Sequence, residues 1–278
     1  MVSGLSALGC LAAVAMAAPP TIIYANATSQ LGARGGTWEH GAADLFDGRD
    51  DTAWCVGTNG LGIRERVGVE FNRAIRADRI RIAAGNPVAF GAFGPANRPR
   101  VLTISNMSYA WQVVLPDDAE PFELPLPPPF TGSQMVVQIE NVYNHGGRHT
   151  CLAEVTLFEG RRPIRLAPMK AQRGQPSLEG VWVRIEAPSP ETFIVFYRDG
   201  RFRHRDNPDM AERRPDRWGR WSWQPDARLR LEVAGDRLDG DAMVSPHDDG
   251  RLRLALTGPY LGRWVPFVPE TGFASDLF

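Results

Sequence analysis

Short runs in which apolar and polar residues alternate recur along most of this chain, and they limit the possible folds more than any other feature. Between residues 67 and 71, for example, Val67, Val69 and Phe71 occupy every second position. A period of two places successive side chains on opposite faces of a strand, so that one face can be buried. Prolines and glycines between the runs break helices and favour turns. The pattern therefore predicts an all-β protein.

The first series of runs predicts an antiparallel sandwich over residues 22–160, because short turns separate the strands. Its runs are Val67–Phe71, Asp78–Ala84, Val101–Ser105, Trp111–Leu115, Pro121–Leu124, Gln134–Asn141 and Leu152–Glu159. Before them, Thr21–Gln30 is expected to form a strand and Leu31–Gly41 a glycine-rich loop. Residues 161–177 are polar and contain several prolines, which is typical of an unstructured linker.

The second series predicts a small up-and-down β-barrel over residues 178–268. Its runs are Gly180–Glu186, Thr192–Arg198, Arg201–Arg205, Gly219–Gln224, Arg228–Val233, Asp236–Val244, Arg251–Thr257 and Tyr260–Phe267. Turns such as Asp199-Gly200 and Asp249-Gly250 favour hairpins between consecutive strands, and about eight such strands can close a barrel. Residues 269–278 are expected to form a loosely held tail.

The N-terminus predicts export. The first twenty residues carry no charge, the segment from Leu5 to Met16 is apolar, and Ala15-Met16-Ala17 fits a signal-peptidase site. We therefore expect residues 1–18 to be a signal peptide that is cleaved near Ala17 or Ala18, and the protein to be secreted or periplasmic. The apolar segment is too short for a transmembrane helix. Residues 7–9 make a poor lipoprotein signal before Cys10, so we expect no lipid anchor.

Removal of the signal peptide leaves two cysteines, Cys55 and Cys151. Two cysteines in an exported protein favour a disulfide, and the loop it closes is worth on the order of 4 kcal/mol in the chain-entropy model. The alternative is a pair of buried free thiols. The net charge of −1 gives no electrostatic footprint for a nucleic acid or a membrane surface.

The stretch from Asp44 to Cys55 combines a tight Asp47-Gly48 turn with short acidic side chains and exposed carbonyls. Such a turn suits a hard cation such as calcium, which takes six to eight oxygen ligands. The alternative is an ordinary loop turn in which Trp54 fills the core.

No pattern in the chain indicates catalysis. The histidines are scattered, no Gly-x-Ser-x-Gly motif occurs, and the carboxylates are unpatterned. The glycine-rich segment Gly57–Ile63 lacks the Lys-Ser/Thr ending of a phosphate-binding loop. We therefore expect a protein that is not an enzyme.

Several motifs in the first half resemble discoidin-like, galactose-binding-like sandwiches, above all the NADase-type glycan-binding domain. They are Leu45-Phe46-Asp47-Gly48, Asp51-Thr52-Ala53-Trp54, Gly60-Leu61-Gly62-Ile63, Asn97-Arg98-Pro99-Arg100, Val142-Tyr143-Asn144 and Thr150-Cys151-Leu152-Ala153-Glu154-Val155. The resemblance extends from about Ile22 to Gly160. Val56, His149 and Ala153 depart from the family pattern.

The resemblance implies a jelly-roll sandwich that binds a glycan or glycoconjugate without catalysis. It implies one structural calcium ion held by Asp47, Asp50, Thr52 and Glu154; the alternative for Glu154 is a salt bridge to an arginine. Sugars are held by aromatic faces and planar polar side chains on loops. The candidate glycan ligands are Trp38, Asn86, Phe90, Phe93, Arg98, Tyr109, Tyr143 and Arg148. The segment 86–97 is the main candidate, unless its aromatic residues pack against one another.

The second half resembles small lipocalin-like barrels through Gly180-Val181-Trp182, the Phe193–Phe202 hairpin and Gly219-Arg220-Trp221. Its tryptophans could line a pocket for a small apolar ligand, or they could simply fill the barrel. They are Trp182, Trp218, Trp221, Trp223 and Trp264. Two alternatives to glycan binding thus remain: a structural or protein-interaction module, and small-ligand binding by the barrel.

Overall fold

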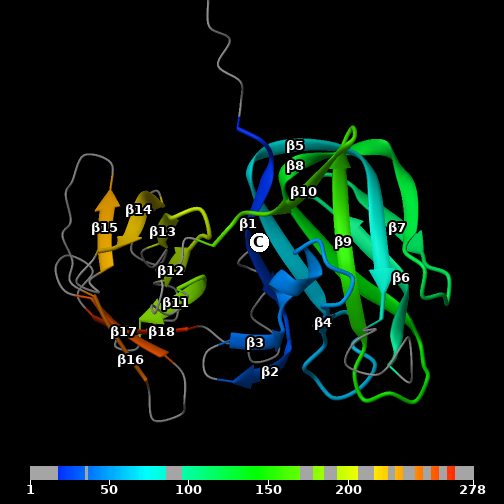
Figure 1. Cartoon of the computed structure of the whole chain (residues 1–278), viewed down its shortest axis with the longest axis horizontal. Coiled ribbons are helices and arrows are strands. Elements are labelled where there is room, and N and C mark those ends of the chain that lie inside the picture. The colour runs from blue at the N-terminus through cyan, green and yellow to red at the C-terminus, as the bar shows by residue number, and fades with distance from the viewer. Residues whose placement is uncertain are drawn as a thin grey trace, which may run out of the picture.

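The structure is a computed structural model, and its strands form two eight-stranded sheets and one two-stranded hairpin (Figure 1). It describes residues 18–34, 37–85, 96–169, 178–184, 193–205, 216–224, 229–233, 242–246, 252–256 and 262–266. Within these residues the one helical element is a short 3-10 turn, η1 (Ala42–Leu45). No helix among them has the length and apolar character needed to span a membrane. The prediction of an all-β protein is confirmed.

The first sheet is the sandwich, with strand order β4-β9-β10-β1-β5-β8-β6-β7 and a further pairing of β9 with β5. Its strands are β1 (Thr21–Ala27), β4 (Trp54–Cys55), β5 (Arg66–Ala84), β6 (Arg98–Ser105), β7 (Ala110–Val114), β8 (Phe122–Tyr143), β9 (Cys151–Glu159) and β10 (Arg162–Leu166). Every pairing between these strands is antiparallel except that of β1 with β10.

Two long strands replace pairs of shorter predicted strands. The runs 67–71 and 78–84 belong to one strand, β5, and the runs 121–124 and 134–141 belong to β8. The first half of β5 pairs with β1, whereas its second half pairs with β9. Register shifts between these halves show that the chain changes neighbours through irregularities in one strand instead of through a turn.

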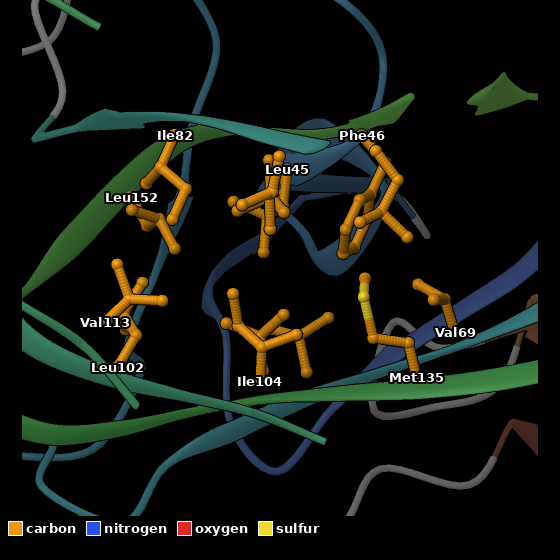
Figure 2. Packing of buried hydrophobic residues seen from close by; sticks show 14 of the residues in the cluster. Leu45, Phe46, Val69, Ile82, Leu102, Ile104, Val113, Met135 and Leu152 are labelled. Atoms are coloured by element: carbon orange, nitrogen blue, oxygen red, sulfur yellow. The ribbon is translucent and has the colours of Figure 1, made fainter. Parts of the chain in front are cut away.

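The core lies between the layers of the sandwich, and Figure 2 shows side chains from opposite strands meeting there. Leu45, the last residue of η1, and Phe46, which follows it, are fully buried together with Leu102 and Ile104 of β6. Trp54 is also fully buried, and its Nε1 donates a hydrogen bond of 2.9 Å to the Ser29 carbonyl. Burial of each such side chain contributes about 1.5–3 kcal/mol.

Two segments that were predicted to lack structure contain strands. The expected loop 31–41 contains the hairpin β2 (Leu31–Arg34) and β3 (Thr37–His40), and the expected linker 161–177 begins with β10. Strand β10 pairs with β9 and with β1, and it buries Ile164. Residues 167–169 of the expected linker are also described, and Ala167 is buried; residues 170–177 lie outside the described part.

The second sheet has the order β15-β14-β13-β12-β11-β18-β17-β16, so that neighbours in sequence are mostly neighbours in space. Its strands are β11 (Gly180–Arg184), β12 (Phe193–Phe196), β13 (Arg201–Arg205), β14 (Arg217–Trp223), β15 (Leu229–Val233), β16 (Ala242–Pro246), β17 (Leu252–Leu256) and β18 (Gly262–Pro266). The first strand, β11, pairs with the last, β18. This is the up-and-down, barrel-like arrangement that the sequence predicts; the lipocalin-like resemblance itself has no further support.

The tryptophans of this sheet do not share one environment. Trp221 is buried in a cluster with Phe196 and Phe202, whereas Trp218 is 43% exposed and stacks on Tyr197 at 5.5 Å. The side chains of Trp182 and Trp264 and the tail 269–278 lie outside the described part of the chain. Among the described side chains Trp221 packs the sheet and Trp218 does not, so both alternatives for the tryptophans stay predictions.

The two sheets share a buried contact across β1. Ile23 and Tyr24 cluster with Phe193, Val195 and Tyr197 of the second sheet. The rings of Tyr24 and Tyr197 meet edge to face at 5.8 Å, and the backbone N–H of Arg198 donates to the Ile23 carbonyl at 3.0 Å. In Figure 1, β1 accordingly lies on the side of the sandwich that faces the second sheet.

Candidate functional site

An open pocket lies at the end of the sandwich where the chain passes from β8 to β9. One wall is the segment 59–61, between β4 and β5, and the other is the connection 144–149, between β8 and β9. The lining residues are Asn59, Gly60, Leu61, Asn144, Gly146, Gly147, Arg148 and His149. Its volume of about 430 Å³ is within the range of small-molecule sites.

Glycines keep part of the pocket free of side chains. Gly60 and Gly146 have φ values of +113° and +80°, which glycine adopts without strain. A Cβ atom added at either position would meet no described atom within 4 Å. The open space therefore reaches the backbone at these two points, and a ligand could approach it closely.

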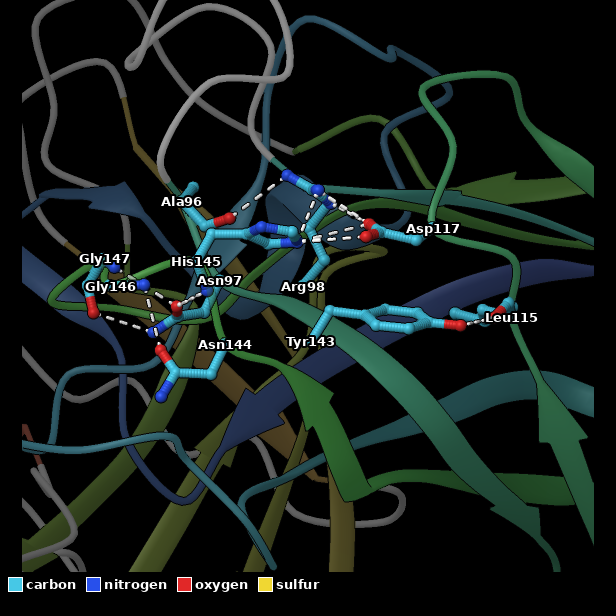
Figure 3. A network of polar contacts seen from close by, with 10 residues as sticks. All are labelled: Ala96, Asn97, Arg98, Leu115, Asp117, Tyr143, Asn144, His145, Gly146 and Gly147. Carbon is cyan, nitrogen blue, oxygen red and sulfur yellow. Dashed lines mark hydrogen bonds and ion pairs between the residues drawn. The ribbon is translucent and has the colours of Figure 1, made fainter.

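The side chain of Asn97 fixes the shape of the 144–149 connection (Figure 3). Its side chain is fully buried, and its Nδ2 donates to the Gly147 carbonyl at 2.7 Å. Its Oδ1 accepts from the backbone N–H groups of His145 and Gly147 at 2.9 and 3.2 Å. One buried amide thus satisfies three backbone groups of a single loop, and it holds that loop in one conformation.

A charged network lies beside this loop. The buried guanidinium of Arg98 donates to Asp117 from Nε and Nη2, at 2.9 and 2.6 Å, and from Nη1 to the Ala96 carbonyl at 3.3 Å. Its Nη2 also lies 2.6 Å from Nε2 of His145. Desolvation raises the pKa of Asp117, but the hydrogen bond and charge of Arg98 outweigh it, and the pKa lies below its ordinary value. The network connects β6, the segment after β7 and the pocket loop.

Two polar side chains of the pocket have groups that remain available to a ligand. Arg148 is exposed, and it makes no hydrogen bond or ion pair with the described residues. The Nδ1 of His149 lies 3.0 Å from the Val56 carbonyl. Because a carbonyl only accepts, Nδ1 carries the proton, and Nε2 of the neutral ring is an acceptor.

Two further contacts shape the walls of the pocket. The Oδ1 of Asn144 accepts from the Gly146 N–H at 2.9 Å, which leaves its NH₂ group as a donor. Buried Thr150 donates from its hydroxyl to the Leu61 carbonyl at 2.7 Å, so it joins the two walls.

The predicted glycan ligands are spread over the fold. Arg148 lines the pocket; Tyr143 lies next to the pocket loop, and its hydroxyl donates to the Leu115 carbonyl at 3.0 Å. Arg98 is engaged in the network just described. Tyr109 follows the far end of β6, where its ring meets Trp111 at 4.7 Å. Trp38 lies in β3 with its side chain outside the described part, and Asn86, Phe90 and Phe93 lie outside the described residues altogether.

Four pocket residues that are not glycine were not selected from the sequence: Asn59, Leu61, Asn144 and His149. Each of them lies in or beside a motif that carries the resemblance, namely Gly60-Leu61-Gly62, Val142-Tyr143-Asn144 or the segment before Cys151. The signal was the proximity of these motifs to predicted strand ends, where the loops of a sandwich gather.

The predicted calcium ligands lie around the Asp47-Gly48 turn and β9. Asp47 accepts from the Thr52 hydroxyl at 2.9 Å, and Asp50 forms an ion pair with Arg81. Glu154 is 1% exposed and accepts from the Thr156 hydroxyl at 2.6 Å and from the Gly48 N–H at 3.0 Å. Desolvation raises the pKa of Glu154 to about 7, against the opposing effect of these two hydrogen bonds.

These contacts do not fit a calcium site as arranged, because protein donors occupy oxygens of Asp47, Asp50 and Glu154. Among the described residues, no group of three or more His, Cys, Asp or Glu side chains is placed to hold a metal. The calcium ion stays a prediction from the resemblance. The donors of Glu154 are a hydroxyl and a backbone amide, and neither is an arginine.

The disulfide prediction is confirmed, because Cys55 and Cys151 are bonded. They stand opposite each other in the pairing of β4 with β9, and both are fully buried. The bond thus ties the segment before one pocket wall to the strand after the other.

Comparison with solved structures finds sugar-binding modules at low similarity. A family 32 carbohydrate-binding module from C. perfringens NanJ, solved with galactose, is 16% identical over 51% of this chain and all of its own, with a TM-score of 0.37. A pectin-binding module is 16% identical over 53% of this chain and 99% of its own, with a TM-score of 0.36. The arabinofuranosyltransferase AftD from Mycobacteria is 13% identical over 53% of this chain and 12% of its own, with a TM-score of 0.41. Similarity at this level is no evidence about the ligand of this chain.

No curated protein matches the chain. A family model does match, and it covers residues 20–158, half of the 278 residues and nearly the whole sandwich. The matched segment includes both walls of the pocket, the disulfide and the Asn97 anchor. The chain therefore belongs to the family of the NAD glycohydrolase translocation F5/8 type C domain, as its motifs predict.

Proposed function

We propose that this protein is an exported, non-catalytic carbohydrate-binding protein that holds its glycan in the pocket between residues 59–61 and 144–149. The observation that supports the proposal is the convergence of planar polar side chains on one open, preorganised cavity. A saccharide offers many hydroxyl groups, each of which both donates and accepts. The pocket supplies both hydrogen-bond donors and hydrogen-bond acceptors, from the side chains of Asn59, Asn144, Arg148 and His149.

The composition of the pocket also supports a binding role over catalysis. None of the eight lining residues in the described part is an acid, a serine, a cysteine or a lysine. A hydrolase that cleaves glycosidic bonds uses a pair of carboxylates on either side of the bond. The pocket offers no such pair.

Export is proposed on two observations. The disulfide between Cys55 and Cys151 is of a kind that persists in oxidising compartments such as the periplasm or the exterior. The uncharged, apolar N-terminal segment fits a signal peptide. Mass spectrometry of the mature protein, secreted from its host, would locate the cleavage site near Ala17 or Ala18.

A glycan array probed with the whole mature protein tests the binding function. We expect selective binding by the wild type, strongly reduced binding by Asn144→Ala, and unchanged binding by Gln112→Ala, whose exposed amide lies on β7 outside the pocket. Equal binding by all three proteins would place the glycan elsewhere on the molecule. Failure of the wild type to bind any glycan would remove the proposal.

The same array, run with calcium and with a chelator, tests the calcium prediction. A bound ion would also raise the melting temperature in a concentration-dependent way, because it stabilises only the folded state. Asp50→Asn should then weaken the effect. If calcium alters neither binding nor melting, the protein contacts of Asp50 and Glu154 take the place of an ion.

A protein-interaction role is the second candidate, and one surface favours it. Met107 is 93% exposed and Tyr109 is 48% exposed in the turn between β6 and β7, at the far end of β6 from the pocket network. Exposed apolar side chains that lie together are typical of contact sites. Loss of binding to a protein partner in Met107→Ser, with glycan binding intact, would favour this role.

A further inference from the structure

The pocket carries a positive charge that no described residue of its walls compensates. Arg148 is its one arginine or lysine, is exposed, and makes no ion pair or hydrogen bond with a described residue. The lining residues that the structure describes include no carboxylate. An arginine in a structural role normally has an acidic or carbonyl partner, as Arg98 has in Asp117 and Ala96. Arg148 is thus exposed and unpaired among the described residues, as expected of a side chain that binds a ligand.

The carboxylates closest in sequence to the two walls, and Asp117 beside His145, already accept hydrogen bonds. On either side of the second wall in sequence, Glu140 accepts from Gln138 Nε2 at 2.9 Å and Glu154 from the Thr156 hydroxyl at 2.6 Å. Glu65 accepts from the hydroxyls of Ser29 and Thr58, at 2.8 and 3.1 Å, and from that of Thr28. Asp117 is held by Arg98. None of these acids lines the pocket, and none forms an ion pair with Arg148.

The remaining polar groups of the pocket suit hydroxyls. The NH₂ group of Asn144 is a donor, and Nε2 of His149 is an acceptor when the ring is neutral. Guanidinium differs from these groups because its planar fork matches both oxygens of a carboxylate. The pocket thus combines groups for a sugar ring with one group for an acidic substituent.

We propose that the preferred ligands are saccharides that carry a carboxylate, and that Arg148 binds this carboxylate while Asn59, Asn144 and His149 bind hydroxyls. The inference rests on the proposed function, because it assigns a ligand class to the same pocket. Arg148 is then the residue that determines specificity for acidic over neutral glycans.

Matched pairs of glycans test the proposal on the whole protein. Sialylated lactose is compared with lactose, and a hexuronate oligosaccharide with its methyl ester, by isothermal titration calorimetry. A charge-assisted hydrogen bond exceeds a neutral one by an amount that corresponds to about a 10-fold preference. We expect the acidic member of at least one pair to bind about 10-fold more tightly, and the preference to shrink in 1 M salt, where charges are screened.

Variants attribute the preference to one side chain. Arg148→Gln should abolish it, and Arg148→Lys, which keeps the charge but loses the fork, should retain part of it. Arg76→Gln is the control, since Arg76 is exposed on β5 and does not line the pocket. Because Arg148 is exposed and without described partners, its variants should fold as the wild type does.

The outcomes separate the inference from the proposed function. Tighter binding of acidic glycans that depends on Arg148 and not on Arg76 supports both. Equal affinity for acidic and neutral members, or a preference unchanged in Arg148→Gln, overturns the inference and leaves glycan binding intact. No binding of any member, together with an empty glycan array, overturns both.

Discussion

At the scale of single residues, Asn97 is the side chain on which the geometry of the pocket most depends. Its amide makes three hydrogen bonds to the backbone of residues 145–147, and it is fully buried. Asn97→Ala would leave these backbone groups unpaired, at a cost of about 1–3 kcal/mol for each buried group that water cannot reach. We expect weaker glycan binding and a lower free energy of unfolding, measured by calorimetric titration and urea denaturation.

A second variant distinguishes lost loop geometry from general instability. Thr156→Val removes a buried hydroxyl that donates to Glu154, in β9 and outside the pocket. It should lower stability without changing affinity at temperatures where the protein stays folded. If Asn97→Ala binds glycan as tightly as the wild type, the anchoring role of Asn97 is wrong.

The raised pKa of Glu154 predicts how this residue's contribution to stability changes with pH. Its pKa rises from an ordinary 4.5 to about 7 because burial disfavours the charged carboxylate. At this residue the folded state therefore binds more protons than the unfolded state between these values, so the contribution of Glu154 to stability is fully present below pH 4.5 and is lost as the pH rises through 7. The shift corresponds to about 3 kcal/mol as an upper figure.

Urea denaturation of the wild type and Glu154→Gln between pH 4 and pH 8, in the presence of chelator, measures this effect. Other titrating groups contribute equally to both proteins, so the difference isolates Glu154. We expect the variant to gain stability relative to the wild type as the pH rises. A difference that does not vary with pH would show that the pKa of Glu154 is the same in the folded and unfolded states, and a relative gain by the wild type as the pH rises would show that its donors lower the pKa.

The sequence locates part of the candidate site. Arg148 is selected because it stands on a loop near a family motif, and it lines the pocket. Arg98 and Tyr143 are selected on the same grounds, but their side chains form structural hydrogen bonds. A sequence shows that a residue is polar and on a loop. Whether its side chain points to solvent or to another strand depends on contacts between residues far apart in the chain.

At the scale of elements, period-two alternation predicts most strands and fails where pairing overrides it. Strand β8 contains Pro125, Pro127, Pro128 and Pro129, which would end a helix but are accepted here in a long, irregular strand. The hairpin of β2 and β3 and the strand β10 are four or five residues long, with too few apolar positions to show a period. Their pairing with neighbours makes them strands, and propensity alone does not.

The disulfide joins two elements, β4 and β9, which lie on either side of the pocket walls in sequence. In the chain-entropy model, closing this loop contributes on the order of 4 kcal/mol. Reduction, or replacement in Cys55→Ala/Cys151→Ala, should therefore lower the urea midpoint markedly. Urea denaturation with and without reductant measures the change, and the double variant should no longer respond to reductant. Equal midpoints for oxidised and reduced protein would contradict this estimate.

At the scale of the whole molecule, the sequence predicts two domains connected by a linker, whereas the structure packs the two sheets against each other. Ile23 and Tyr24 of β1 are apolar positions that an isolated sandwich would expose on one face, and the second sheet covers them. The contact also buries an ion pair, Glu70 with Arg203, at 3.6 Å. An alternation pattern does not predict a contact between two sheets, because the same residues could equally face solvent or a core.

Tyr197 tests whether this contact makes the two sheets one cooperative unit. Its ring packs against Tyr24 on one side and Trp218 on the other, whereas its hydroxyl has no hydrogen-bond partner among the described residues. Tyr197→Ala removes the ring from the interface and should cost about 3–5 kcal/mol, the usual range for aromatic truncation in a core. Tyr197→Phe keeps the ring and should be neutral or slightly stabilising.

Differential scanning calorimetry should then show one transition for the wild type and Tyr197→Phe, and two for Tyr197→Ala, because the sandwich and the second sheet melt separately once their contact is lost. Two transitions already in the wild type would mean that the interface is too weak to couple the sheets, and the sandwich would then be thermodynamically independent of the sheet that follows it.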